Sequence, residues 1–154
     1  MANARIGIMS DLKTTLEGID GTGDYTTTMG SVYRHIRTWN EADHTIRPIA
    51  CIHFGSEVYQ YETFGAGGEG NIRVQLTVDL LFYLNAATEA TRITALDNLL
   101  DDVWIALHND TTRGGNAIST TIVSAQSDQP DIDGQEALRV TLLIVYDRDT
   151  GVSS

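Results

Sequence analysis

The chain has 154 residues, of which 42% are hydrophobic, and carries a formal net charge of −11. This length suits one domain that buries its own core, and no run approaches the ~18 consecutive apolar residues of a membrane helix. Because an acidic surface repels phosphate groups, the composition disfavours a nucleic-acid-binding domain. The first ten residues lack the pattern of a secretion signal. The single Cys51 lies in an apolar run and is expected to be a buried core residue of a protein assembled in a reducing compartment.

The first third of the chain predicts a helix and a short strand. Apolar residues at helical spacing predict a helix over roughly Asn3 to Ile19, which Gly18 and Gly21 weaken and then end. The acidic, glycine-containing link at 20–24 lacks the ligand spacing of a calcium-binding loop. Residues 32–34 are the strongest strand prediction in this part of the chain.

Two β-prone stretches flank a glycine-rich segment. Pro48 begins the first, Ile49–Phe54, because proline cannot donate a ladder hydrogen bond. Residues 57–62 can extend this strand outward, and we expect a projecting glycine-rich loop over about 56–71. The second stretch, residues 72–84, alternates between apolar and mostly polar side chains, which predicts a long strand with one buried face.

A second helix is predicted after this long strand. Its apolar stripe steps by three and four residues through Ile93, Leu96, Leu100, Val103 and Leu107. The helix is expected over about 88–108, with Asn85 or Thr88 as its cap and its acidic side chains in solvent. Those acidic residues are Asp97, Asp101 and Asp102.

The C-terminal third predicts two further strands, Ile118–Ala125 and an alternating one over 138–146, with a polar turn at 126–134 between them. The tail from about residue 149 is expected to fray. No linker or repeat divides the sequence, so residues 1–154 are expected to form a single domain. Because helices and strands do not alternate regularly, we predict an α+β fold. Its mainly antiparallel sheet has a long central strand or hairpin and is packed by the two helices.

The sequence carries no catalytic or cofactor-binding signature. Gly65, Gly67 and Gly70 have the GxGxxG spacing, but they precede a strand, whereas the dinucleotide motif must open a helix. Glu69 would also repel a phosphate. The four histidines do not pair at i, i+4 spacing for a metal, and no GxSxG elbow occurs. We therefore expect no enzymatic activity, no cofactor and no metal site.

Aromatic residues in the glycine-rich projection are the first candidate for a contact surface. Such residues must either fold back onto the core or meet a partner, and both interpretations stay open. The polar face of the long strand is the second candidate. The residues of the predicted contact surface are Glu57, Tyr59, Tyr61, Phe64, Gly67, Glu69, Arg73, Gln75, Asp79 and Arg113.

The whole layout resembles the tail terminator (tail completion, minor tail) proteins of long-tailed bacteriophages. The resemblance begins with the N-terminal helix, Val32-Tyr33-Arg34 and the proline-led strand at 47–52. It continues through the glycine-rich excursion, the long strand Ile72–Leu84 and the helix segment Leu96–Leu107. Gly134–Tyr146 is similar to the closing strand of the family, so the resemblance covers most of the chain.

This resemblance implies a structural role in the virion. Members of the family form a ring, usually of six subunits, that caps the finished tail tube, stops its polymerisation and joins the tail to the head. The implied partners are further copies of the chain, the tail tube protein and the head–tail connector or neck protein. The ring is expected at the head-proximal end of the tail, after assembly in the host cytoplasm and without a membrane. The family offers no catalytic residues to transfer.

The net charge gains a meaning in this setting. An acidic channel lets DNA slide through the lumen without specific binding, because like charges repel. Two other interpretations stay open: another neck or tail-tube ring protein, and a small α+β enzyme or ligand-binding domain. The last of these needs a concave site with convergent polar groups, which the sequence does not indicate.

Overall fold

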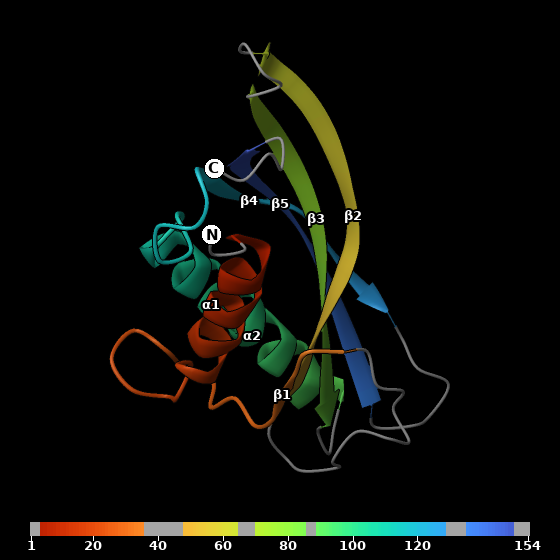
Figure 1. Cartoon of the computed structure of the whole chain (residues 1–154). Helices are drawn as coiled ribbons and strands as arrows, with labels where there is room; N and C mark the ends of the chain where they lie inside the picture. The colour runs from red at the N-terminus through yellow and green to blue at the C-terminus, as the bar shows by residue number, and fades with distance from the viewer. Residues whose placement is uncertain (1–3, 36–47, 65–69, 86–88, 129–134, 150–154) are drawn as a thin grey trace.

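A computed structural model describes residues 4–35, 48–64, 70–85, 89–128 and 135–149. In chain order its elements are α1 (Ala4–Glu17), β1 (Val32–Tyr33), β2 (Ile49–Phe64), β3 (Gly70–Asn85), α2 (Glu89–Asn109), β4 (Ser119–Asp128) and β5 (Gln135–Asp149). The strands form one sheet in the order β1-β2-β3-β5-β4, and both helices lie against one face of it (Figure 1). The predicted α+β fold is confirmed.

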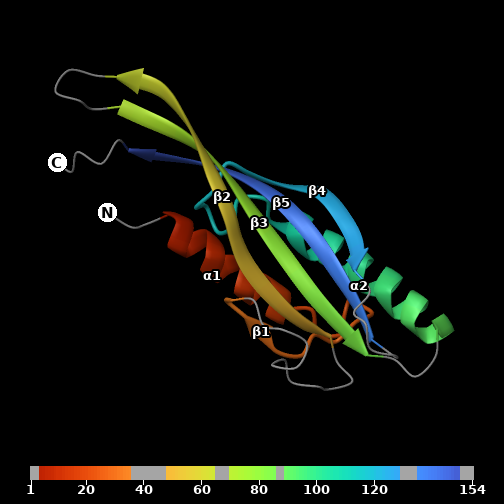
Figure 2. The same ribbon diagram turned by 90° about the vertical axis from the view of Figure 1, so that its right-hand side faces the viewer.

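The sheet is antiparallel except at β1, which pairs with β2 in parallel at Val32 and Ala50. β2 and β3, each of 16 residues, form a hairpin about 50 Å long at ~3.3 Å per residue. Figure 2 shows this hairpin curving past the N-terminal end of α1. The helices therefore cover only part of its length, and its outer end extends past them, while the residues Ile72, Val74 and Leu76 on its helix side stay buried.

The core lies between the helices and the buried face of β3, and it follows the predicted alternation. The residues on that face, each at most 7% exposed, are Ile72, Val74, Leu76, Val78, Leu80, Phe82 and Leu84. On the opposite face Leu81 is 8% exposed and packs with Cys51 and Ala137 in a small second cluster. Cys51 is therefore a buried core residue, as predicted.

The predicted stripe of α2 is confirmed at Val103 and Leu107, and Leu96 and Leu100 pack against the core, but the prediction is wrong at Ile93. Leu99, Val103 and Leu107 are buried, whereas Ile93 is 55% exposed. The predicted stripe did not include Leu99. Because a helix has 3.6 residues per turn, more than one set of apolar residues spaced by three and four can be drawn along this sequence. Trp104, next to the buried stripe, is 52% exposed.

Asp102 corrects the prediction that the acidic residues of α2 lie in solvent. Asp97 and Asp101 are exposed, but Asp102 is only 2% exposed. Its carboxylate accepts hydrogen bonds from the backbone N–H groups of Thr26 at 3.1 Å and Thr27 at 2.5 Å. A buried carboxylate needs such donors, and here they fasten the segment after α1 to α2.

The hairpin strands are longer than predicted. β2 runs to Phe64 and β3 begins at Gly70, so the projecting loop is shorter than the predicted range 56–71. Backbone pairing, as between Phe64 and Gly70, extends a ladder regardless of side-chain polarity. β4 likewise continues past its predicted end. Residues 65–69 and 150–154, which include the loop tip and the tail expected to fray, lie outside the described residues.

Candidate functional site: the projecting hairpin

The two faces of the projecting hairpin carry different side chains. Tyr59 pairs with Val74 and Tyr61 with Ile72, and both β3 residues belong to the core face. Cross-strand partners in an antiparallel pair share a face. Both tyrosines therefore lie on the side of the helices, while Val58 points the other way and is 61% exposed.

A β-bulge at Gly55 sets this arrangement. Strict alternation from the core residue Ile52 would place Val58 on the helix side, and the extra residue brings Glu57 there instead. A side chain at Gly55 would be too close to β3, because an added Cβ would lie 2.9 Å from the Thr77 carbonyl oxygen. One glycine thus decides which residues the hairpin presents on each face.

Glu57 anchors the hairpin where it leaves the body of the domain. Its side chain is 1% exposed, and its carboxylate lies 3.3 Å from Arg5 Nη1. The hydroxyls of Tyr146 and Tyr59 donate hydrogen bonds to it at 2.7 Å and 2.5 Å. The cluster joins α1, β2 and β5. Glu57, predicted as a contact residue, is therefore buried, and it fixes the direction of the hairpin.

The electrostatics of this cluster favour an ionised carboxylate. Burial alone would raise the pKa of Glu57, but hydrogen bonds from Tyr59 and Tyr146 and the charge of Arg5 outweigh it, so this pKa lies below its ordinary value. Burial and the bond to Glu57 raise the pKa of Tyr146. The bond to Glu57 also raises the pKa of Tyr59. Both phenols consequently remain donors, and the cluster holds at neutral pH.

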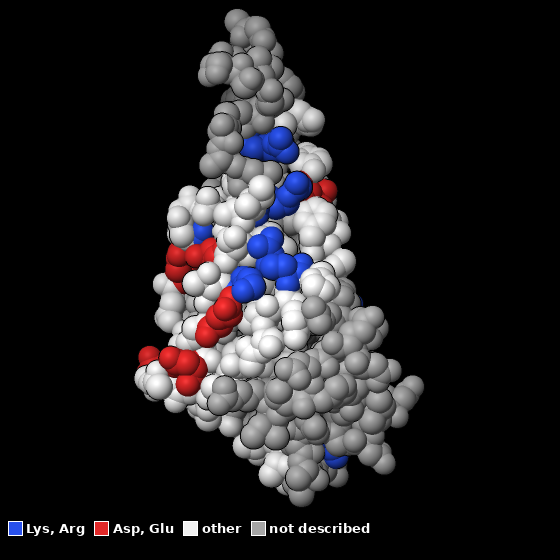
Figure 3. Space-filling model, turned by 60° about the horizontal axis from the view of Figure 1, so that its bottom comes forward, with Lys and Arg blue, Asp and Glu red and all other residues white. Residues whose placement is uncertain are grey.

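Beyond this anchor, the helix-side face of the hairpin combines exposed aromatic rings with arginines. Tyr59 is 49% exposed and Tyr61 57% exposed. Arg148 is exposed and lies in the same cross-strand row as Tyr61, through Ile72. Figure 3 shows basic side chains gathered along the half of the molecule that leads to the hairpin, with acidic ones toward the lower left. We call Tyr59, Tyr61 and Arg148 the hairpin patch.

The opposite face of the sheet carries the polar residues of β3, two of which pair with residues of β5. Arg73 forms a two-point ion pair with Asp147, with N···O distances of 3.1 and 3.4 Å. Asp79 accepts a hydrogen bond from the Thr141 hydroxyl at 2.8 Å. Gln75, in the same row of β3, is exposed. The predicted interface residues therefore separate onto two faces of the sheet.

Arg113 belongs to neither face and is removed from the candidate interface. It is fully buried, and its Nη2 donates to the Leu107 carbonyl at 2.7 Å while its Nη1 lies 3.2 Å from Asp11. A cation at this position caps the C-terminus of α2 and ties it to α1. Burial lowers the pKa of Arg113, and the nearby Asp11 and Asp110 partly offset that effect.

The remaining predicted interface residues are not placed. Phe64 ends β2, but its side chain lies outside the described part of the chain. Gly67 and Glu69 lie in the segment 65–69, which is also outside it.

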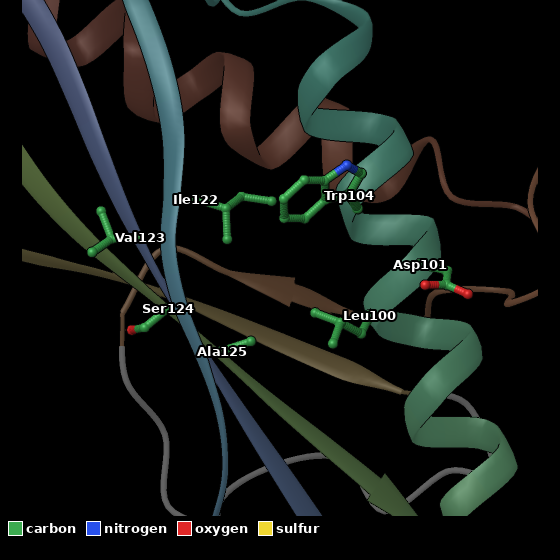
Figure 4. Close-up of a pocket in the computed structure, with 7 residues that line it drawn as sticks. All are labelled: Leu100, Asp101, Trp104, Ile122, Val123, Ser124 and Ala125. Carbon is green, nitrogen blue, oxygen red and sulfur yellow. The ribbon is translucent and has the colours of Figure 1, made fainter.

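A second apolar surface, which the sequence did not reveal, lies between α2 and the edge strand β4. It is a groove of about 370 Å³ lined by Leu100, Asp101, Trp104, Ile122, Val123, Ser124 and Ala125. In Figure 4 the side chain of Trp104 extends from α2 toward Ile122 on β4, and Leu100 extends toward Ala125. The side chains of Val123 and Ser124 point to the other side of β4. Val123 is 59% exposed because a bulge between Ile122 and Ser124 displaces it from the ladder. We call this feature the α2–β4 groove.

Metal-site geometry, membrane-spanning helices and comparisons with known proteins give no further assignment. Among the described residues, no group of His, Cys, Asp or Glu side chains could hold a metal ion, and no helix is long and apolar enough to cross a membrane. The sequence matches no protein-family model, and no curated protein is significantly similar to it.

Proposed function

We propose that the chain is a structural subunit of a bacteriophage tail, of the tail terminator kind. It assembles with further copies into a ring that caps the tail tube, ends tube polymerisation and presents a joining surface to the head or its connector. One observation carries this proposal: a hairpin of two 16-residue strands projects past the helices and presents half-exposed tyrosines.

The hairpin has the properties of an interaction arm. Tyrosine and arginine are enriched at protein interfaces, and rigid aromatic side chains make strong anchors. Tyr59 is held by its hydroxyl on Glu57, which also binds α1 and β5. An arm that is already ordered loses less conformational entropy on binding. The exposed rings therefore favour contact with a partner over the alternative that they fold back onto the core.

The acidic character of the chain fits a channel through which DNA passes. The net charge is −11, and exposed acids include Glu17, Asp20, Asp24, Asp97 and Asp101. A ring of such subunits has a negative field that keeps DNA from adhering to its wall. The localisation that follows from this proposal is the head-proximal end of the virion tail.

Electron microscopy of the purified chain added to tail tubes tests the proposal. We expect one closed ring at one end of each tube, and tubes that no longer elongate when more tube protein is supplied. A chain that forms open-ended tubes by itself would instead favour a tube protein. A chain that binds neither tubes nor itself would contradict both assignments.

A further inference from the structure

We infer that the hairpin patch of one copy docks into the α2–β4 groove of a second copy, so that subunits join head to tail. This interface rests on the ring proposed above and names the two surfaces that build it. Tyr61, with Tyr59 beside it, is the anchor that enters the groove, and Trp104 is the main receiving side chain.

The groove has the size and lining of a receptor for an aromatic side chain. Its volume of about 370 Å³ lies in the ~300–1,000 Å³ range of binding pockets. Leu100 and Trp104 form one wall, and Ile122 and Ala125 form the other. Trp104 stacks on His108 at 4.7 Å between ring centroids, which holds the indole in place while leaving it 52% exposed.

The hairpin patch and the groove cannot meet within one copy. The tyrosines of the patch lie on β2 and the groove lies along β4, and β3 and β5 separate these two strands in the sheet. With strands ~4.8 Å apart, these elements are held about 14 Å from each other. Each copy thus exposes two different apolar surfaces. Contacts between unlike surfaces are heterologous, and they generate a ring when the rotation closes.

Charge favours a second copy of this chain as the occupant. Arg148 is exposed in the same cross-strand row as Tyr61, and the charge of Arg5, on the same side of the sheet, is already balanced by Glu57. Asp101 lines the groove, and Asp97 is exposed one turn earlier on α2. The cationic aromatic arm and the acidic apolar groove are therefore complementary surfaces on one sequence, and opposite charges across an interface favour the correct partner.

Strand addition at the free edges is a less suitable contact. β2 carries register shifts between Phe54 and Ser56 and between Tyr61 and Thr63, and β4 carries one between Ile122 and Ser124. Bulges on edge strands interrupt the row of backbone donors and acceptors, which discourages pairing with another strand. Side chains entering a groove need no continuous ladder.

Disulfide cross-linking between copies tests the contact directly. The full-length chain is made with Cys51→Ser and either Tyr61→Cys or Ala125→Cys, and the two proteins are mixed under oxidising conditions. Ala125 is exposed, and its side chain points from β4 into the groove. We expect a linked dimer at least about tenfold more abundant in the mixture than when Ile93→Cys replaces Ala125→Cys. Ile93 is the matched control, because it is 55% exposed on α2 but does not line the groove.

A charge exchange tests the same contact without cysteines. Arg148→Asp and Asp101→Arg should each weaken self-association about tenfold or more at low salt, and the two changes in one chain should restore it.

The outcomes of the cross-linking experiment separate the interface from the ring. If the chain assembles but the yield of linked dimer is no higher than with the Ile93→Cys control, this interface is overturned and the proposed ring is not. Linkage of Ala125→Cys to the tube protein but not to Tyr61→Cys would also overturn the interface. A chain that never self-associates, alone or on tubes, would overturn both the interface and the ring.

Discussion

The Tyr146 hydroxyl donates a hydrogen bond to the Glu57 carboxylate at 2.7 Å, joining β5 to β2 across the intervening strand β3. Both groups are buried, with the Glu57 side chain 1% exposed and Tyr146 3% exposed. The bond lies where the hairpin leaves the layer of helices. It therefore couples the stability of the domain to the direction of its projecting arm.

Glu57→Ala should lower the free energy of unfolding by roughly 1–3 kcal/mol, because the buried Tyr146 hydroxyl loses its acceptor. Urea denaturation monitored by circular dichroism measures this change. Glu17→Ala is the control: its carboxylate is 48% exposed and pairs with Lys13 on the surface. Its loss should be within about 0.5 kcal/mol. Equal effects of the two substitutions would show that the Glu57 cluster does not stabilise the domain.

The same carboxylate predicts a pH dependence. The pKa of Glu57 is lowered in the folded chain, so the stabilisation it contributes is fully present above the unfolded value of about 4.3. That contribution is lost as the pH falls through the lower folded pKa. The stability difference between the natural chain and Glu57→Gln should therefore be constant from pH 7 to 5 and shrink below about 4. A difference that instead grows on acidification would contradict the assigned direction.

Asp102 and Asp101 form a natural pair of adjacent acids with opposite environments. Asp102→Ala removes the buried carboxylate that accepts hydrogen bonds from the backbone N–H groups of Thr26 and Thr27. We expect a loss of roughly 1–3 kcal/mol of stability. Asp101→Ala, on the exposed side of the helix, should change stability by less than about 0.5 kcal/mol in the dilute protein. Thermal unfolding of the two variants side by side checks the contrast.

Asp110 should titrate at unusually low pH. Its carboxylate accepts bonds from the Thr112 hydroxyl at 2.6 Å, the Thr112 N–H at 2.9 Å and the Gly114 N–H at 2.8 Å. The Thr112 hydroxyl and these backbone donors lower the pKa of Asp110 to about 2. Carboxyl-carbon NMR should show this midpoint, and Thr112→Val should raise it. An unchanged midpoint in the variant would mean that the hydroxyl does not set it.

Much of the scaffold could be predicted from the sequence because its signals are local. The alternation over residues 72–84 identified the buried face of β3, and the apolar run around Cys51 identified a core strand. The Gly55 bulge could not be predicted, because one extra residue in a ladder leaves the side-chain pattern ambiguous. Tyr59 is predicted as a surface aromatic, but the hydrogen bond between its partner Glu57 and Tyr146 spans 89 residues and has no local signal.

The same limitation explains the site residues that were wrongly placed or missed. Asp102 and Arg113 look like solvent-exposed charges, and only tertiary contacts with Thr26, Thr27 and Asp11 bury them. The α2–β4 groove depends on a second bulge, beside Val123, and on Trp104 lying off the buried stripe. Trp104 is a large apolar residue outside the predicted helical stripe, and it was the one sequence signal that could have indicated the α2–β4 groove.

The mass of the native assembly tests the central claim most directly. Native mass spectrometry of the purified chain, alone and after release from tail tubes, should give one discrete closed oligomer, with six copies as the expected number. Trp104→Glu should reduce that oligomer to smaller species, and Ile93→Glu should leave it intact. A chain that stays monomeric in both preparations, or that gives an unbounded series of larger masses, would contradict a capping ring.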